Sequence, residues 1–325
     1  MESPETSSRA PEPSASSSRW ERDVLERLAF AALQEQRRAR RWGIFFKLLG
    51  FAYLAAVLAM VVDWPWAGEL VHERHTALVD VHGVIESDGA NSAENINAAL
   101  LRAFEDKKTA GIVLRINSPG GSPVQSGIVY DEIKRLRALY PKIPLHAVVE
   151  DLCASGGYYI AAAADRIYVD KASIVGSIGV LMDGFGFTGS MEKLGVERRL
   201  MTAGEHKGFL DPFSPQDAHQ RQHAQVLLDD IHKQFIDVVR KGRGDRLKDS
   251  PDLFTGLMWT GQRSVDLGLA DDFGTVDSVA RDVVQAEAVV DFTIKQGITD
   301  RLAKRFGAGM GESFGGLLRG AVRLF

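Results

Sequence analysis

The stretch Ala154-Ser155-Gly156-Gly157-Tyr158-Tyr159-Ile160 comes shortly after a strand-like run at 144–150. Small residues at this junction favour a sharp turn from a strand into a helix, which exposes the side chain at the corner. The first amides of such a helix have no partner within it, so they can hold an anion. The stretch therefore predicts that Ser155 is a hydroxyl nucleophile at the end of a strand.

The segments around this corner alternate between strands and helices. Runs rich in apolar and β-branched residues predict strands, at 76–85, 111–116, 144–149 and 166–169. Helices are expected between them, at 123–140, at 156–164 and after Asn91, which can cap a helix together with Glu94. This alternation implies right-handed crossovers and a parallel sheet, so the fold class is α/β.

A longer helix is expected at 217–241. It carries apolar residues at helical spacing, among them Ile231 and Phe235, and this spacing is typical of a core-facing stripe.

Composition excludes several classes of protein. The 325 residues carry a net charge of −4, so no basic surplus favours a nucleic-acid partner. The single cysteine, Cys153, excludes an internal disulfide, and no cluster of Cys and His has the spacing of a zinc site. With 45% hydrophobic residues, the chain can form a folded core of ordinary composition.

The N-terminal part predicts a membrane anchor. Residues 1–41 are expected to be a cytoplasmic tail with a disordered start and a basic helix. The apolar run 42–62 carries only one charge, Lys47, and as a helix it would extend over roughly 32 Å, enough to cross a bilayer. We therefore expect a transmembrane helix at 42–63 and a linker at 64–75.

Charge sets the expected orientation of this anchor. Arginines at 37, 38, 40 and 41 precede the span, and Asp63 and Glu69 follow it. The positive-inside rule then predicts a cytoplasmic N-terminus and a C-terminal domain on the translocated, periplasmic or extracellular, side of the inner membrane. A cleaved signal peptide is disfavoured because the basic leader is too long and no Ala-x-Ala site follows the apolar run.

A serine hydroxyl needs a base to become a nucleophile at neutral pH. The histidine closest in sequence, His146, falls inside a predicted strand and is expected to be packed. Cys153 is expected to point into the core. A lysine can act as the base if its pKa falls by some 3 units. Lys207 is one candidate, but these considerations alone do not single it out among the lysines.

Three short stretches occur in a recognisable order. They are Ile116-Asn117-Ser118-Pro119-Gly120-Gly121, the stretch around Ser155 quoted above, and Gly176-Ser177-Ile178-Gly179-Val180. Together they resemble the signal peptide peptidase A family, the S49 serine peptidases, in its short single-copy form. The resemblance covers residues 76–290, which implies a peptidase domain of the crotonase and Clp-protease type, followed by a C-terminal tail at 291–325.

The resemblance also implies roles for individual residues. Ser155 would be the nucleophile, Lys207 the general base, and Ser177 the residue that orients the lysine amine. The backbone amide of Gly156, with that of Gly121 or Gly120, would form the oxyanion hole. Neither a metal nor a cofactor is expected.

The implied function is that of a membrane-anchored endopeptidase. By resemblance, its substrates are remnant signal peptides and other short or unfolded peptides. Double-length family members place the serine and the lysine in different halves, so the short form is expected to be a homo-oligomer with shared active sites. Two alternatives remain: a crotonase-like enzyme acting on acyl thioesters, and a catalytically silent, membrane-tethered peptide-binding protein.

Overall fold

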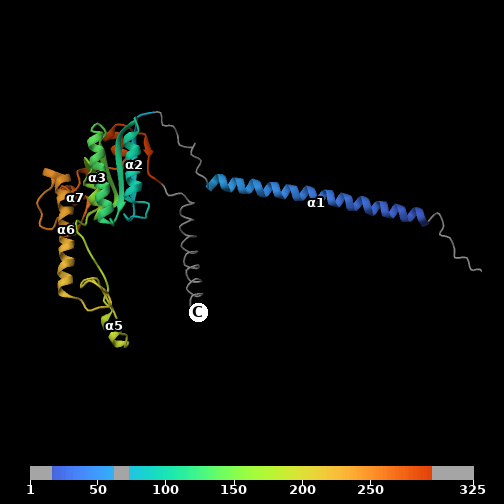
Figure 1. The fold of residues 1–325 in the computed structure, drawn as a ribbon. Coiled ribbons are helices and arrows are strands. Elements are labelled where there is room, and N and C mark those ends of the chain that lie inside the picture. Colours follow the sequence, from blue (N-terminus) through green and yellow to red (C-terminus); the bar gives the residue numbers. More distant parts are fainter. Residues whose placement is uncertain (1–16, 62–72, 295–325) are drawn as a thin grey trace, which may run out of the picture. The chain divides into compact units, whose positions relative to one another are not determined.

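The computed structural model describes residues 17–61 and 73–294 (Figure 1). The chain divides into two compact units, residues 1–69 and 70–325. The described part of the first unit is one long helix, α1 (Ser17–Val61). Most of the predicted linker and all but the first residues of the predicted tail lie outside the described residues.

Among the residues that the structure describes, no helix is both long enough and apolar enough to cross a membrane. The transmembrane helix predicted at 42–63 therefore has no support from the structure. Helix α1 continues unbroken from the charged stretch before Trp42 into the apolar run. Residues 58–63, which complete the predicted span, lie outside the part of the chain whose side chains are described.

The second unit is built on an eight-stranded sheet. Its strands are β1 (His75–His82), β2 (Thr109–Ser118), β3 (Leu145–Ala154), β4 (Arg166–Val169), β5 (Ile174–Gly176), β6 (Met258–Thr260), β7 (Asp272–Phe273) and β8 (Val289–Asp291). The main path runs β6-β5-β3-β2-β1-β8, and β4 and β7 branch from β3. Every pairing is parallel except that of β5 with β6, so the predicted α/β class with a mostly parallel sheet is confirmed.

Helices connect the strands, and those at 93–105, 123–139, 156–161 and 218–243 lie where the sequence predicted helices. The helices are α2 (Ala93–Glu105), α3 (Pro123–Leu139), α4 (Gly156–Ala161), α5 (Thr188–Lys193), α6 (Ala218–Arg243), α7 (Gly261–Asp266) and α8 (Val276–Ser278), with the 3₁₀ helix η1 (Gly244–Arg246) and the π-helix η2 (Val279–Val284). Pro123 opens α3 at a position where a missing amide hydrogen costs no helical hydrogen bond.

The prediction that Asn91 caps α2 is wrong by one residue. The cap is Ser92, whose Oγ accepts the amide of Asn95 at 3.3 Å. The Asn91 side chain instead hydrogen-bonds the backbone of His82 at the end of β1, through both its oxygen and its nitrogen. Asn91 and Ser92 are both suited to capping a helix, but the side chain of Asn91 is used in the tertiary contact with His82, so Ser92 is the cap.

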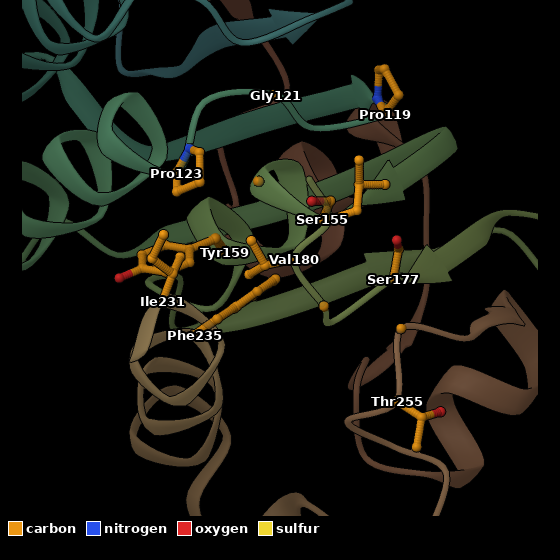
Figure 2. A pocket seen from close by; sticks show the side chains of 14 residues that line it. Pro119, Gly121, Pro123, Ser155, Tyr159, Ser177, Val180, Ile231, Phe235 and Thr255 are labelled. Atoms are coloured by element: carbon orange, nitrogen blue, oxygen red, sulfur yellow. The ribbon is translucent and has the colours of Figure 1, made fainter. Parts of the chain in front are cut away.

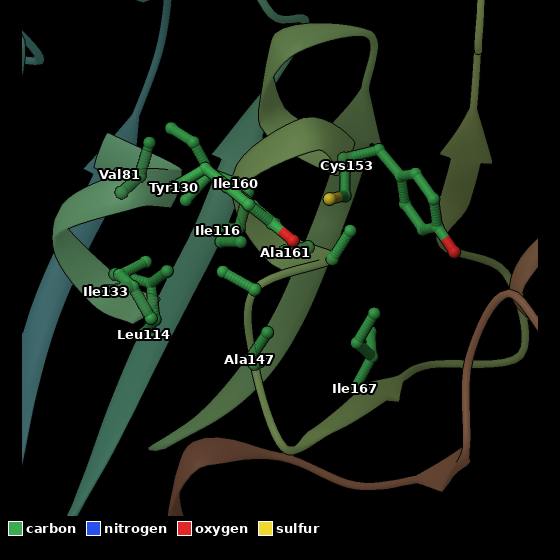
Figure 3. Close-up of a cluster of buried hydrophobic side chains, with 14 of the residues drawn as sticks. Val81, Leu114, Ile116, Tyr130, Ile133, Ala147, Cys153, Ile160, Ala161 and Ile167 are labelled. Atoms are coloured by element: carbon green, nitrogen blue, oxygen red, sulfur yellow. The ribbon is translucent and has the colours of Figure 1, made fainter. Parts of the chain in front are cut away.

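Alternation along the central strands places the core. Every second residue of β1, β2 and β3 points toward α2, α3 and α4, and Figure 3 shows part of the resulting cluster around Leu114, Ile116 and Ile133. Cys153 and Ile160 belong to the same cluster, so the prediction that Cys153 points into the core is confirmed. The intervening residues form a smaller apolar cluster on the opposite face, which includes residues of η2.

A buried arginine fixes the C-terminal end of α6 to the sheet. Arg243 is 1% exposed; its Nε donates to the carbonyl oxygen of Gly268 and its Nη1 to Asp271 Oδ2, both at 2.8 Å. Burial alone would raise the pKa of Asp271, but the hydrogen bond and charge of Arg243 hold it below its usual value. Asp271 Oδ2 also accepts the amide of Ile167 in β4.

Replacing Arg243 by methionine should strongly destabilise the second unit, because Asp271 would lose its most closely held cation in a largely buried setting. We expect Arg243→Met to lower the free energy of unfolding by about 3–5 kcal/mol, measured by urea titration with circular dichroism. Arg263→Met is the matched control. It removes a long, exposed pair with Asp266 (3.8 Å) and should cost about 1 kcal/mol or less. Equal losses in the two variants would contradict the role given to Arg243.

Candidate active site

The chain turns sharply at Ser155. Strand β3 ends at Ala154 and α4 begins at Gly156, so Ser155 alone forms the corner. Its φ of 50° and ψ of −121° are values that residues with a side chain rarely adopt. The Ser155 amide donates to the carbonyl oxygen of Gly176 at 2.9 Å, which helps to hold the corner in this conformation. Backbone strain of this kind clusters at functional sites.

Ser177 lies beside this corner. Strands β3 and β5 pair in parallel with Ala154 opposite Gly176, so the next residue of each strand, Ser155 and Ser177, comes at the same edge of the sheet. Ser177 also has a positive φ, 53°, and its amide donates to the carbonyl oxygen of Leu257 at 2.8 Å. Figure 2 shows the two serine side chains at the ends of these neighbouring strands.

The turn around Gly120 and Gly121 packs directly against the Ser155 corner. A Cβ added to Gly120 would lie 2.6 Å from the Gly156 nitrogen and 2.7 Å from Ser155 Cβ, so no side chain fits there. Ile85 holds the turn from the other side: its amide donates to the carbonyl oxygen of Gly120, and its own carbonyl oxygen accepts the amide of Ser122. Both glycines have positive φ, 98° and 148°.

The amides of this turn differ in their availability. The Gly120 amide donates to Ser118 Oγ at 3.1 Å. No hydrogen bond between described residues uses the amide of Gly121 or Gly156. A Cβ built on Gly156 would lie 3.3 Å from the Gly121 nitrogen, so the two free amides are close neighbours. The predicted oxyanion hole pairs the amide of Gly156 with that of Gly121 or Gly120, and this geometry favours Gly121.

A cavity of about 560 Å³ opens in front of the two serines. Its size is typical of a site for a small molecule or a few residues of a peptide. Ser155, Gly156, Ser177 and Gly121 line one part of it. Five further lining side chains form a largely apolar wall: Pro123, Tyr159, Val180, Ile231 and Phe235. In Figure 2, Tyr159 and Val180 lie beside the α6 residues Ile231 and Phe235.

The apolar wall is a feature that the sequence did not reveal. The spacing of Ile231 and Phe235 along α6 predicted a core-facing stripe, and Phe235 is indeed buried. Its ring packs against that of Tyr159, with centroids 5.0 Å apart. Helical spacing alone cannot distinguish a residue that fills a core from one that forms the wall of a cavity.

Lys207 does not line the cavity, and its side chain is exposed. The segment that carries it packs near the start of α6: His206 stacks on His219 with ring centroids 5.1 Å apart, and the Leu210 amide donates to Gln220 Oε1. His219 and Ile231 are twelve residues apart on one helix, a rise of about 18 Å. The structure thus brings Ser155, Ser177, Gly120, Gly121 and Gly156 together and leaves Lys207 away from them.

Two other reactive residues near Ser155 in the sequence, His146 and Cys153, are buried in β3. His146 is 6% exposed in β3 and packs edge-on against Tyr168, as expected of a packed histidine. Burial lowers its pKa. Burial raises the pKa of the Cys153 thiol, so its reactive thiolate form is disfavoured.

Two family models match the chain over this region. The model of peptidase family S49 matches residues 137–290, which include Ser155, Ser177 and Lys207. The Clp protease model matches residues 70–175, which include the turn at Gly120 and Gly121.

Three relatives illustrate the range of similarity. A Brucella melitensis protein named "Na(+)/H(+) antiporter NhaA" is 44% identical over 214 residues, 64% of this chain and 29% of that protein. "Putative signal peptide peptidase SppA" of Enterococcus faecium is 29% identical over 66% of this chain and 64% of its own length. "Putative protease slr0021" of Synechocystis is 34% identical over 65% of this chain and 73% of its own length.

The chain thus spans less than a third of the Brucella protein and a little under two thirds of the Enterococcus one. It covers 73% of the Synechocystis protease at 34% identity. This coverage, the S49 model match and the geometry around Ser155 agree: the chain belongs to peptidase family S49.

Proposed function

We propose that the protein is a serine endopeptidase in which Ser155 is the nucleophile and Lys207 the general base. The observation that carries this proposal is the Ser155 corner, with the neighbouring free amides of Gly121 and Gly156 at one edge of a partly apolar cavity. Two donors so placed can bind the oxyanion of a tetrahedral intermediate, and losing one such donor typically costs about 3–4 kcal/mol in the transition state.

The reaction runs through an acyl-enzyme. The neutral amine of Lys207 accepts the proton of Ser155 Oγ as this oxygen attacks the peptide carbonyl carbon, and the ammonium then protonates the leaving amine. Water attacks the resulting ester while the same amine takes a proton from that water. The ester bond then breaks, the ammonium returns the proton to Ser155 Oγ, and the peptide leaves with a new carboxyl group. In this mechanism Ser177, beside Ser155, accepts a hydrogen bond from the lysine amine and orients it.

The apolar wall of the cavity favours peptides with apolar side chains as substrates. Remnant signal peptides fit this chemistry because their central segments are apolar. The name of the Enterococcus relative points in the same direction. We propose these peptides, and other short or unfolded ones, as the substrate class.

We further propose that the lysine comes from a neighbouring subunit. The rise of about 18 Å along α6 between the Lys207 segment and the cavity exceeds the length of a lysine side chain. The segment between the cavity and Lys207 also exposes large apolar side chains, which an assembly would cover: Phe185, Leu194 and Met201, each at least 78% exposed. A homo-oligomer would bring the lysine of one subunit to the serine of another and would bury these apolar side chains.

Removing either member of the dyad should abolish hydrolysis while the fold is kept. We expect Ser155→Ala and Lys207→Ala each to lower kcat/KM on an apolar peptide by at least about 10³-fold, with circular dichroism unchanged. Lys193→Ala, an exposed lysine on α5, is the control and should retain activity. Hydrolysis at the normal rate in Lys207→Ala would exclude Lys207 as the base.

A shared site should be restored by mixing the two inactive variants. When Ser155→Ala and Lys207→Ala chains are co-expressed in equal amounts, about a quarter of the subunit junctions in a ring would pair an intact serine with an intact lysine. We expect recovered activity of that order, relative to an all-wild-type assembly. Co-assembly without any recovery would place both residues of the dyad in one chain.

The location at the inner membrane is a proposal from the sequence pattern alone. The arginines before Trp42 and the apolar run after it predict that alkaline phosphatase fused after Gly68 is active and that the same reporter fused after Arg41 is inactive. The reverse pattern would invert the proposed topology, and two inactive fusions would argue against a membrane anchor that carries the peptidase domain across.

A further inference from the structure

His232 on α6 links this helix to the turn that carries Ser177. Its Nε2 lies 3.1 Å from the carbonyl oxygen of Ile178, a residue 54 positions earlier in the chain. A carbonyl oxygen can only accept a hydrogen bond, so Nε2 must carry the proton and act as the donor. His232 is half-buried, and it follows Ile231, which lines the cavity in front of Ser155.

The turn that His232 contacts is held in a conformation that needs support. Ser177 has a φ of 53°, unusual for a residue with a side chain. Its amide donates to the carbonyl oxygen of Leu257, and its carbonyl oxygen accepts the amide of Gly179 at 2.9 Å. The His232 bond is a further restraint and comes from a different element, α6. Such conformations persist where several contacts impose them together.

The same turn contributes directly to the cavity. Gly179 and Val180 line it together with Ser177, and the side chain of Ile178, which lies between Ser177 and Gly179 in the chain, is fully buried in the core. The Ile178 side chain and the His232 bond to its carbonyl therefore fix the turn from two directions. Loss of the hydrogen bond to the Ile178 carbonyl oxygen would let the Ser177 hydroxyl move relative to Ser155.

We propose that His232 is a positioning residue: it donates a hydrogen bond to the Ile178 carbonyl and thereby holds Ser177 in the place from which it orients the lysine amine at Ser155 of the same chain. This inference rests on the proposed dyad. His232 does not line the cavity, and its donor nitrogen is engaged with Ile178, so it acts through the turn and not on the substrate.

Two substitutions of His232 distinguish the effect of its hydrogen bond from the effect of packing its ring. His232→Phe keeps an aromatic ring of similar size but has no donor, whereas His232→Gln can present an amide donor at a similar reach. We expect His232→Phe to lower kcat/KM about 10-fold, with most of the loss in kcat, and His232→Gln to stay within about 3-fold of wild type.

Lys233→Gln, on the neighbouring exposed position of α6, is the control and should leave the kinetics unchanged. Thermal unfolding should be similar for all three variants. Equal losses in the phenylalanine and glutamine variants would assign the effect to packing of the imidazole ring and overturn the proposal. Wild-type kinetics in the phenylalanine variant would overturn it as well.

Mixed assemblies test whether His232 serves the site of its own chain. In the mixture described above, Lys207→Ala chains supply only the serine and Ser155→Ala chains only the lysine. His232→Phe added to the Lys207→Ala chain should reduce the recovered activity about 10-fold, and added to the Ser155→Ala chain it should leave that activity unchanged. An equal or opposite pattern would contradict the assignment.

The two levels of the proposal fail in different ways. If the unmodified mixture recovers no activity, the shared dyad is wrong, and the comparison of phenylalanine with glutamine in the otherwise wild-type chain still decides the role of His232. The mixture could instead recover activity that is the same whichever of the two chains carries His232→Phe. In that case the shared dyad stands and His232 has no positioning role.

Discussion

The close approach of two backbone segments underlies the whole site. The turn at Gly120 packs so tightly against the Ser155 corner that a single added carbon atom would collide with the Gly156 nitrogen. This approach places the free amides of Gly121 and Gly156 side by side, next to a serine held in a strained conformation. Backbone strain at one such residue costs of order 1–3 kcal/mol. The packing of the parallel sheet behind Ser155 offsets this cost.

Helix α6 organises the rest of the site. Its middle forms the apolar wall of the cavity through Ile231 and Phe235, its first turn contacts the segment that carries Lys207, and its last turn is fixed by Arg243. One rigid element therefore separates the two proposed members of the dyad within a chain. The same rigidity would let each subunit present its lysine to a neighbour.

Local sequence signals predicted the Ser155 corner well, because two glycines after a strand have a direct conformational consequence. The alternation of strands and helices likewise predicted the α/β class. The position of Ser177 beside Ser155 depends on β5 pairing with β3, a long-range contact that β4 interrupts in the chain order, and here only the family resemblance pointed to it. The cavity wall on α6 and the bond from His232 depend equally on tertiary contacts.

Covalent labelling of the full-length protein with a fluorophosphonate, followed by mass spectrometry of its peptides, tests the nucleophile most directly. We expect a single phosphonyl adduct on the peptide that contains Ser155 and none on the peptide that contains Ser177. Inhibition accompanied by an adduct on a different residue, or labelled protein in which Ser155 stays unmodified, would contradict the assignment of Ser155 as the activated hydroxyl.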